Sequence, residues 1–505
     1  MSRFRTYLEN TFHLTSTESE EVMSALVKPL KKSIRINTHK ISRADFILHA
    51  REQGWILTET DIPEVFLIDR EDTSLALGRT LEHQAGWFYI QEVAAAHPPF
   101  LLKREIMKNE KSSPRHSSQG RMQGGREVES IPVSDTNDDM DPRIKSEDDG
   151  LQGGTILDMC ASPGGKTTQL ADYFPESLII ANEVNRSRTP QLFDNLDRMG
   201  YDNVAVVSCD GRFFQNFPEY FDTVLLDAPC SGEGTAFRDS SVIDHWHEKN
   251  IHRIAKLQKQ LFETAMTIVK PGGFISYSTC TLNKEENENV ILLSEEIQNT
   301  KDKVQNEGNI GLHDTLKTQN SKLKTSKSGA NMFEKLFEKR FWPHIEHTGG
   351  FFASIFRKQS AEILPHEYPL LPSQGQTPFV RPATRGERET VERFTVKHLK
   401  TELKNTHLFI SKDGVYANRH NLGPLMQYFF FVHAGAKIGT LKGNVFTPTQ
   451  HLWWHLEETA QIPVIILDDK EYATTTHEDG YYTCTRGRGI IGIGQVLKGK
   501  ILTNL

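Results

Sequence analysis

The sequence has few cysteines and no long apolar segment, and both absences narrow the class of protein. Only five of its 505 residues are cysteines, an odd number spread between positions 160 and 484. This argues against a disulfide framework and against paired Cys-x-x-Cys zinc ligands, so no metal site is predicted. No apolar run approaches the roughly 20 residues that a bilayer-spanning helix needs. The first residues are polar rather than a secretory signal, so we expect a cytoplasmic protein without a membrane partner.

An excess of positive charge is also missing. The 59 Lys and Arg residues against 66 Asp and Glu residues give a formal net charge of −7 at pH 7. Overall charge therefore gives no argument for nucleic-acid binding, and any contact with RNA must use local basic patches. Arg35, on a predicted strand, and the basic turn at 486–489 could each contact a phosphate, with solvated surface as the alternative.

Composition divides the chain into five parts, and its length predicts more than one domain. Residues 1–102 have the pattern of an α/β module. Residues 103–153 are rich in Ser, Gly and charged residues and are predicted to be a disordered insertion. Residues 154–360 alternate strand and helix patterns, with a flexible polar insert at about 298–330. A proline-rich linker at 361–383 precedes a C-terminal region, residues 384–505, where small α/β or β-rich units are expected.

The central part predicts an α/β fold with a doubly wound, Rossmann-like parallel sheet. Strands are expected at 155–159, 177–181, 203–207, 222–227, 273–278 and 351–356. Helices are expected at 167–173, 188–199 and 252–269.

A glycine turn follows the first of these strands. Paired glycines let the backbone approach a ligand closely, and the following helix directs its free N–H groups toward the ligand. A phosphate loop is the first alternative, because Gly165, Lys166 and Thr167 resemble its end. That motif requires a glycine where this chain has Cys160, so we favour a different cofactor.

Two acidic residues follow the next two predicted strands. Glu183 lies where an acid accepts hydrogen bonds from a ribose diol, and Asp210 could hold an adenine amino group. Either acid alone is more commonly a helix cap or a loop residue. Together with the glycine turn, they outline an adenosine site.

Two cysteines and a carboxylate follow the fourth and fifth strands. Asp227 and Cys230 belong to Asp-Ala-Pro-Cys-Ser-Gly, and Cys280 belongs to Ser-Thr-Cys-Thr. A single cysteine is by default an inert core residue. Here the carboxyl ends of parallel strands point into one crevice, so the three side chains should converge beside the cofactor.

Thiolate chemistry beside an adenosine-bearing methyl donor suggests methylation of a carbon that is not nucleophilic by itself. Attack of a cysteine on C6 of a pyrimidine makes C5 able to accept a methyl group, and loss of the C5 proton then releases the enzyme. A carboxylate near N3 would stabilise the charge on the ring. A second cysteine could help to break the intermediate, but the residues alone do not say which cysteine attacks.

Three stretches, at 160–166, 226–234 and 278–287, together resemble the signature of the RNA cytosine-5 methyltransferases of the NOP/Sun family, in particular its bacterial members that act on 16S rRNA. The resemblance implies S-adenosylmethionine as cofactor and a PUA-like RNA-binding region at the C terminus. It makes Cys280 the nucleophile and Cys230 the residue that assists release, with Asp227 also reaching the base. The cofactor-binding residues that it implies are Cys160, Ala161, Ser162, Pro163, Gly164, Gly165, Lys166, Glu183, Asp210 and Asp227.

The expected activity is methylation of C5 of a cytosine in structured RNA, with the base flipped into the crevice. The resemblance favours 16S rRNA, and tRNA is the alternative substrate. A non-catalytic RNA-binding ribosome-assembly factor is the alternative from another class, and the presence of both cysteines argues against it. We expect a monomer whose partner is rRNA, in the small ribosomal subunit, or tRNA.

Overall fold

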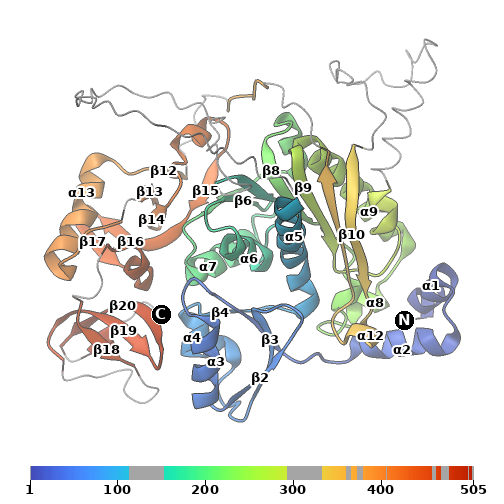
Figure 1. Cartoon of the computed structure of the whole chain (residues 1–505), viewed down its shortest axis with the longest axis horizontal. Coiled ribbons are helices and arrows are strands. Elements are labelled where there is room, and N and C mark those ends of the chain that lie inside the picture. Colours follow the sequence, from blue (N-terminus) through green and yellow to red (C-terminus); the bar gives the residue numbers. More distant parts are fainter. Residues whose placement is uncertain are drawn as a thin grey trace, which may run out of the picture.

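A computed structural model describes residues 2–112, 153–292, 332–359, 366–371, 379–404, 406–457, 462–467, 477–498 and 500–502. An N-terminal module and a β-rich C-terminal region lie beside a large central sheet (Figure 1). Within the described ranges, no helix is both long and apolar enough to cross a bilayer.

The central sheet has eight strands in the order β10-β11-β9-β8-β5-β6-β7-β15. The strands are β5 (Thr155–Asp158), β6 (Leu178–Asn182), β7 (Val204–Val207), β8 (Phe221–Asp227), β9 (Val269–Thr279), β10 (Phe333–Phe341), β11 (Phe351–Lys358) and β15 (Phe431–Ala434). Strands β5 to β9 pair in parallel, and β10, β11 and β15 pair antiparallel at the two ends. The chain runs from β5 to β6 on one side and returns to β8 on the other, which places the switch point between β5 and β8. The predicted doubly wound fold is confirmed.

Helices cover both faces of this sheet, so its strands are apolar on both sides. One face is covered by α5 (Val93–Ser112), α6 (Gly165–Tyr173) and α7 (Thr189–Met199), and the other by α9 (Glu248–Ile268) with η2 (Gly211–Asn216). Short helices occupy the connections near the site. They are η3 (Glu233–Thr235), α8 (Ser241–Asp244), α10 (Glu288–Ile291) and α12 (Pro343–Glu346).

The N-terminal module packs an antiparallel sheet of order β2-β3-β1-β4 against the side of the central domain that carries α6. Its elements are α1 (Ser2–Phe12), α2 (Ser16–Val27), β1 (Ser33–Ile36), α3 (Arg43–Glu52), β2 (Trp55–Glu59), β3 (Val65–Arg70), η1 (Leu77–Arg79), α4 (Leu81–Gln84) and β4 (Phe88–Ile90). Arg35, on β1, is fully buried. It donates to Oε1 of Gln91 at 2.9 Å and to Oγ1 of Thr168, in α6, at 2.7 Å. Its guanidinium therefore joins the module to α6 and does not face a phosphate.

The C-terminal region forms two sheets, of order β12-β13-β14-β16-β17 and β18-β19-β20-β21. The elements are β12 (Val380–Pro382), α13 (Arg385–Phe394), η4 (Thr395–Leu399), β13 (His407–Ser411), β14 (Val415–Asn418), η5 (Gly423–Gln427), β16 (Ala436–Lys442), β17 (Val445–Pro448), η6 (Gln450–His455), β18 (Val464–Ile466), β19 (Gly480–Arg486), β20 (Gly489–Leu497) and β21 (Lys500–Leu502). The second sheet shares a hydrophobic core with the N-terminal module. Arg486, in the predicted basic turn, is buried there against Glu82. The PUA-like character of this region stays a prediction.

Three boundaries differ from those expected from composition. Helix α5 continues through residues 103–112, because Leu101, Leu102 and Ile106 are buried against the central sheet; the predicted insertion therefore begins with a helix. Strand β12 lies inside the predicted linker. Strand β15 belongs to the C-terminal region by its place in the sequence but completes the central sheet. Most of the 103–153 insertion and all of the 298–330 insert lie outside the described residues.

Candidate active site

The glycine turn joins β5 to α6 at the carboxyl edge of the sheet. Gly164 has φ 103°, a left-handed conformation that glycine adopts without strain, and α6 begins at the next residue. The helix thus starts two residues before its predicted position, and its free N–H groups lie at the turn. This is the backbone arrangement that the motif predicted.

Asp158 is a site residue that the sequence analysis missed. It ends β5, is buried, and accepts a hydrogen bond from Oγ1 of Thr167 at 2.6 Å, while its Oδ1 has no hydrogen-bond partner. Burial raises the pKa of Asp158 to about 7, and the charge of Asp227 adds to this, although the hydrogen bond from Thr167 lowers it. A buried carboxyl oxygen without a partner beside the glycine turn is a place for a ligand's donor group. The available signal was an acid at the end of the first strand.

Glu183 and Asp210 follow the ends of β6 and β7, the next two strands of the sheet, but their surroundings differ. Glu183 is buried, accepts the backbone N–H of Asn185 at 2.7 Å, and lies 3.5 Å from a guanidinium nitrogen of Arg188. Asp210 is half-exposed and is held by Arg212, whose Nη2 lies 2.6 Å from its Oδ2. The hydrogen bonds from Arg212 lower the pKa of Asp210. Asp210 also caps η2, as the helix-cap alternative expected.

Cys230 and Cys280 meet beyond the ends of β8 and β9. Their sulfur atoms are 3.0 Å apart, and both are free thiols. The parallel pairing of β8 and β9 continues through a bond from the N–H of Ala228 to the carbonyl of Ser278, at 2.8 Å. The hydrogen bond with Cys280 and then burial raise the pKa of the Cys230 thiol well above its ordinary value. The convergence expected from the strand ends is present in the structure.

Asp227 connects the glycine turn to these cysteines. One carboxyl oxygen accepts from Nζ of Lys166 at 2.7 Å, and the other accepts from Oγ of Ser278 at 2.7 Å. Lys166 comes from α6 and Ser278 from β9. One carboxylate therefore fixes the relative position of the turn and the strand that carries Cys280.

Glu286 binds the loop that carries Cys230, and the sequence analysis did not assign it a role. It is fully buried and accepts from the N–H of Ser231 at 2.9 Å, from Nε2 of Gln258 at 2.8 Å and from Nδ2 of Asn283 at 2.8 Å. Ser231 is the residue after Cys230, so Glu286 holds the loop that carries that cysteine. Its polar sequence context is also that of an exposed loop, which is why composition gave no signal.

Backbone segments touch directly behind the Cys230 loop. The N–H of Gly234 donates to the carbonyl of Cys280 at 3.0 Å, and the N–H of Gly350 donates to the carbonyl of Gly234 at 3.1 Å. A Cβ on Gly234 would lie 1.7 Å from the carbonyl oxygen of Gly350. Only glycine allows this approach.

A doubly wound sheet, a glycine turn at its switch point and two thiols beside a carboxylate are the arrangement expected of an S-adenosylmethionine-dependent methyltransferase. Matches to known proteins narrow this class. The family model for 16S rRNA methyltransferase RsmB/F matches residues 149–357, and the model for the N-terminal domain of 16S rRNA methyltransferase RsmF matches residues 5–93. The chain belongs to the 16S rRNA methyltransferase RsmB/F family, and it is an RNA methyltransferase that uses S-adenosylmethionine.

Relatives cover most of the chain. Ribosomal RNA small subunit methyltransferase F of Vibrio atlanticus is 33% identical over 441 residues, which are 86% of this chain and 79% of that protein. The protein of the same name from Vibrio cholerae is 29% identical over 490 residues, which are 96% of this chain and 88% of that protein. Among solved structures, a methyltransferase homologue from Pyrococcus horikoshii is 27% identical and covers 69% of this chain and 92% of its own, with a TM-score of 0.46. NSun6 from Pyrococcus horikoshii with SFG is 21% identical and covers 71% of this chain and 98% of its own, also with a TM-score of 0.46.

The residues at the switch point fit the cofactor. The open backbone of the glycine turn, the unpartnered Oδ1 of Asp158 and the buried carboxylate of Glu183 lie at adjacent strand ends.

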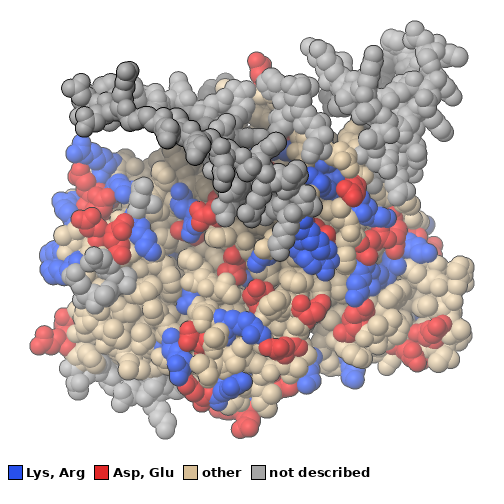
Figure 2. All heavy atoms as spheres, viewed as in Figure 1, with Lys and Arg blue, Asp and Glu red and all other residues tan. Residues whose placement is uncertain are grey.

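Basic and acidic residues are interspersed over the face in Figure 2, among those described, and do not form one wide patch. RNA contacts on that face would have to be local.

Proposed function

We propose that this chain methylates C5 of a cytosine in 16S rRNA through a covalent bond between Cys280 and C6 of the base. The observation that carries the proposal is the 3.0 Å separation of the Cys230 and Cys280 sulfurs next to Asp227. The names of the Vibrio relatives favour small-subunit rRNA over tRNA as the substrate.

The cofactor would be held by residues 160–166 and Glu183, with Asp158 and Asp227 close to it. S-adenosylmethionine supplies the methyl group that C5 receives. Asp210 is assigned to the adenine on the resemblance, and Arg212 would have to release one of its carboxyl oxygens for this contact.

Cys280 forms the bond to C6, and the C5=C6 double bond shifts its electron density toward C5 and the ring. Asp227, near N3, would stabilise the charge that develops on the ring. After C5 carries its methyl group, a base in the site accepts the C5 proton, the electron pair of that bond forms C5=C6 again, and the sulfur–C6 bond breaks. These steps restore both the aromatic base and the Cys280 thiolate.

The position of Cys230 gives it a role at the release step, because its sulfur lies 3.0 Å from that of Cys280. Its hydrogen bond with Cys280 is the largest cause of its raised pKa, so Cys230 stays a protonated thiol before the attack. Once Cys280 is bonded to C6, this cause is removed. Cys230 then lies beside the adduct and can exchange a proton during release.

Denaturing gels of each variant with 16S rRNA test the assignment. Cys230→Ala should accumulate a protein–RNA adduct, whereas Cys280→Ala should form neither adduct nor methylated RNA. An adduct with Cys280→Ala, and none with Cys230→Ala, would reverse the two roles. Bisulfite sequencing of rRNA and tRNA, with and without the gene, separates the two substrates.

A further inference from the structure

The segment that follows the nucleophile, residues 280–287, is here named the catalytic loop. Its inner face is held by the catalytic domain, because Asn283, Glu286 and Asn287 are fully buried. Asn287 accepts from Oγ1 of Thr279 at 2.5 Å and donates to the carbonyl of Thr281 at 3.1 Å. These bonds fix the loop on one side of Cys280.

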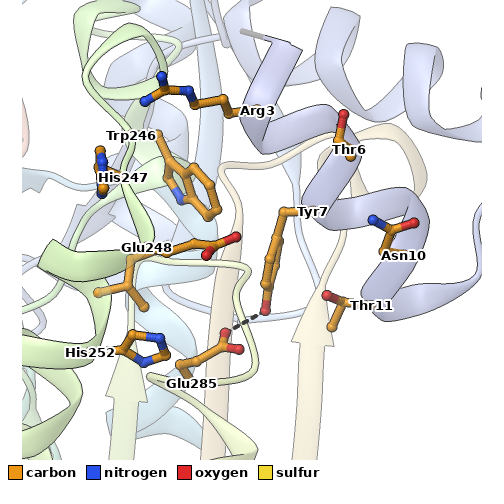
Figure 3. Close-up of a pocket in the computed structure, with 11 residues that line it drawn as sticks. Arg3, Thr6, Tyr7, Asn10, Thr11, Trp246, His247, Glu248, His252 and Glu285 are labelled. Carbon is orange, nitrogen blue, oxygen red and sulfur yellow. Dashed lines mark hydrogen bonds between the residues drawn. The ribbon is translucent and has the colours of Figure 1, made fainter.

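The outer face of the catalytic loop is held by α1, more than 270 residues away in the sequence. The hydroxyl of Tyr7 accepts the backbone N–H of Lys284 at 2.9 Å and donates to Oε2 of Glu285 at 2.5 Å (Figure 3). Nζ of Lys284 donates to the carbonyl of Thr11, at the end of the same helix, at 3.1 Å. One hydroxyl thus bonds both the backbone and a side chain of the loop.

Trp246 connects the two faces. Its ring centroid is 5.2 Å from that of Tyr7, and its Nε1 donates to Oε1 of Glu233 at 2.7 Å. The same carboxyl oxygen accepts from Nδ2 of Asn283, inside the loop, at 2.9 Å. Helix α1, Trp246 and the loop therefore form one connected unit.

The Tyr7–Glu285 bond lies at the wall of a cavity rather than in a closed core. This cavity, of about 680 Å³, lies between α1 and the start of α9. Tyr7 and Glu285 are each partly exposed. Removing the Tyr7 hydroxyl would leave its ring packed on Trp246, so the hydrogen bonds can be removed with little loss of packing.

We propose that Tyr7 and Glu285 are positioning residues for methyl transfer, and that α1 holds the catalytic loop so that Cys280 stays aligned with Cys230 and the base. The inference rests on the proposed function, since it takes Cys280 as the attacking residue. A bond between α1 and the loop restricts the motion of the sulfur without touching RNA or cofactor. Its loss should therefore lower kcat more than it changes KM.

Steady-state methylation of 16S rRNA by the full chain tests this. Tyr7→Phe removes both bonds of the hydroxyl, the one to the Glu285 carboxylate and the one from the Lys284 N–H, which corresponds to a fall in kcat of about tenfold or more. KM for RNA and for S-adenosylmethionine should stay within about twofold of wild type. Asn10→Ala is the matched control, because Asn10 is exposed on α1 and borders the same cavity.

Variants of Glu285 separate positioning from a loss of folding. Glu285→Ala leaves the bond between the Lys284 N–H and the Tyr7 hydroxyl, so it should lower kcat in the same direction as Tyr7→Phe but no further, whereas Glu285→Gln, which still accepts from the hydroxyl, should keep most of the wild-type kcat. The double variant Tyr7→Phe with Glu285→Ala should be no slower than Tyr7→Phe alone, because Tyr7→Phe has already removed the bond to Glu285.

A wild-type kcat in Tyr7→Phe, or fully additive losses in the double variant, would overturn the proposal that α1 positions the catalytic loop. So would an equal loss in Asn10→Ala. A wild-type chain that makes no 5-methylcytosine in RNA contradicts the proposed function instead, so the two failures are distinguishable.

Discussion

Arg486 forms a buried ion pair between the C-terminal region and the N-terminal module. Its Nε lies 2.7 Å from Oε1 of Glu82, and the two side chains are 8% and 1% exposed. His49 contacts the same oxygen at 2.9 Å. Burial raises the pKa of Glu82, but the hydrogen bond with His49 and the charge of Arg486 together lower it below its ordinary value. The interface therefore holds a charged carboxylate.

Arg486→Met should leave that carboxylate buried without its main counter-charge. Breaking one partner of a buried pair costs about 3–5 kcal/mol of unfolding free energy. Arg488→Met is the matched control: Arg488 lies 3.5 Å from Glu52, both side chains are 51% exposed, and such a surface pair contributes about 0–1 kcal/mol. Urea unfolding followed by tryptophan fluorescence measures both, since Trp87 bonds the carbonyl of Ile490 at this interface.

The stability difference between wild type and Arg486→Met should depend on pH in a definite direction. Because the pKa of Glu82 is lowered by folding, its contribution is present above the unfolded value, about 4.3, and is lost as the pH falls through the folded value. The difference between wild type and Arg486→Met should therefore be largest near neutrality and shrink in acid. The reasoning is refuted if Arg486→Met is no less stable than Arg488→Met, or if acid leaves their difference unchanged.

Three further outcomes are expected. Gly234→Ala should cost at least about 1–3 kcal/mol, because the added Cβ meets backbone, whereas Gly386→Ala in α13, with nothing within 4 Å, should stabilise slightly in the same urea titration. Lys166→Met, which removes the 2.7 Å bond to Asp227, should lower incorporation of labelled methyl groups about tenfold or more. Folding raises the pKa of Asp158 to about 7, so wild type should lose stability as the pH rises through that value, and Asp158→Asn should flatten the slope in unfolding titrations.

Local sequence patterns were enough for the parallel core of the fold. Strands β5 to β8 are short apolar runs ended by polar turns, and these strands and β9 were each predicted to within a few residues. The pairing of β15 with β7 was not predictable, because nothing in residues 431–434 indicates a partner more than 220 positions earlier. The buried roles of Arg35 and Arg486 were missed for the same reason, since their partners lie far away in the sequence.

In the candidate site, too, local patterns predicted some features, and contacts between distant residues determine the others. Cys230, Cys280 and Asp227 were expected to converge because the ends of parallel strands share one edge of the sheet, and the structure brings them together. The Asp210 carboxylate forms an ion pair with Arg212, two residues later in the chain, instead of pointing unpaired into the site. Tyr7 could not have been found, because its contact with the catalytic loop depends on how the N-terminal helix docks.

The edge strand β15 has a consequence for how the protein is made. Residues 431–434 close the side of the sheet beyond β7, so this edge stays open on the ribosome until synthesis has passed residue 434. An open apolar edge is a template for pairing with other chains. Premature termination before this strand should therefore yield an aggregation-prone fragment rather than a smaller working enzyme.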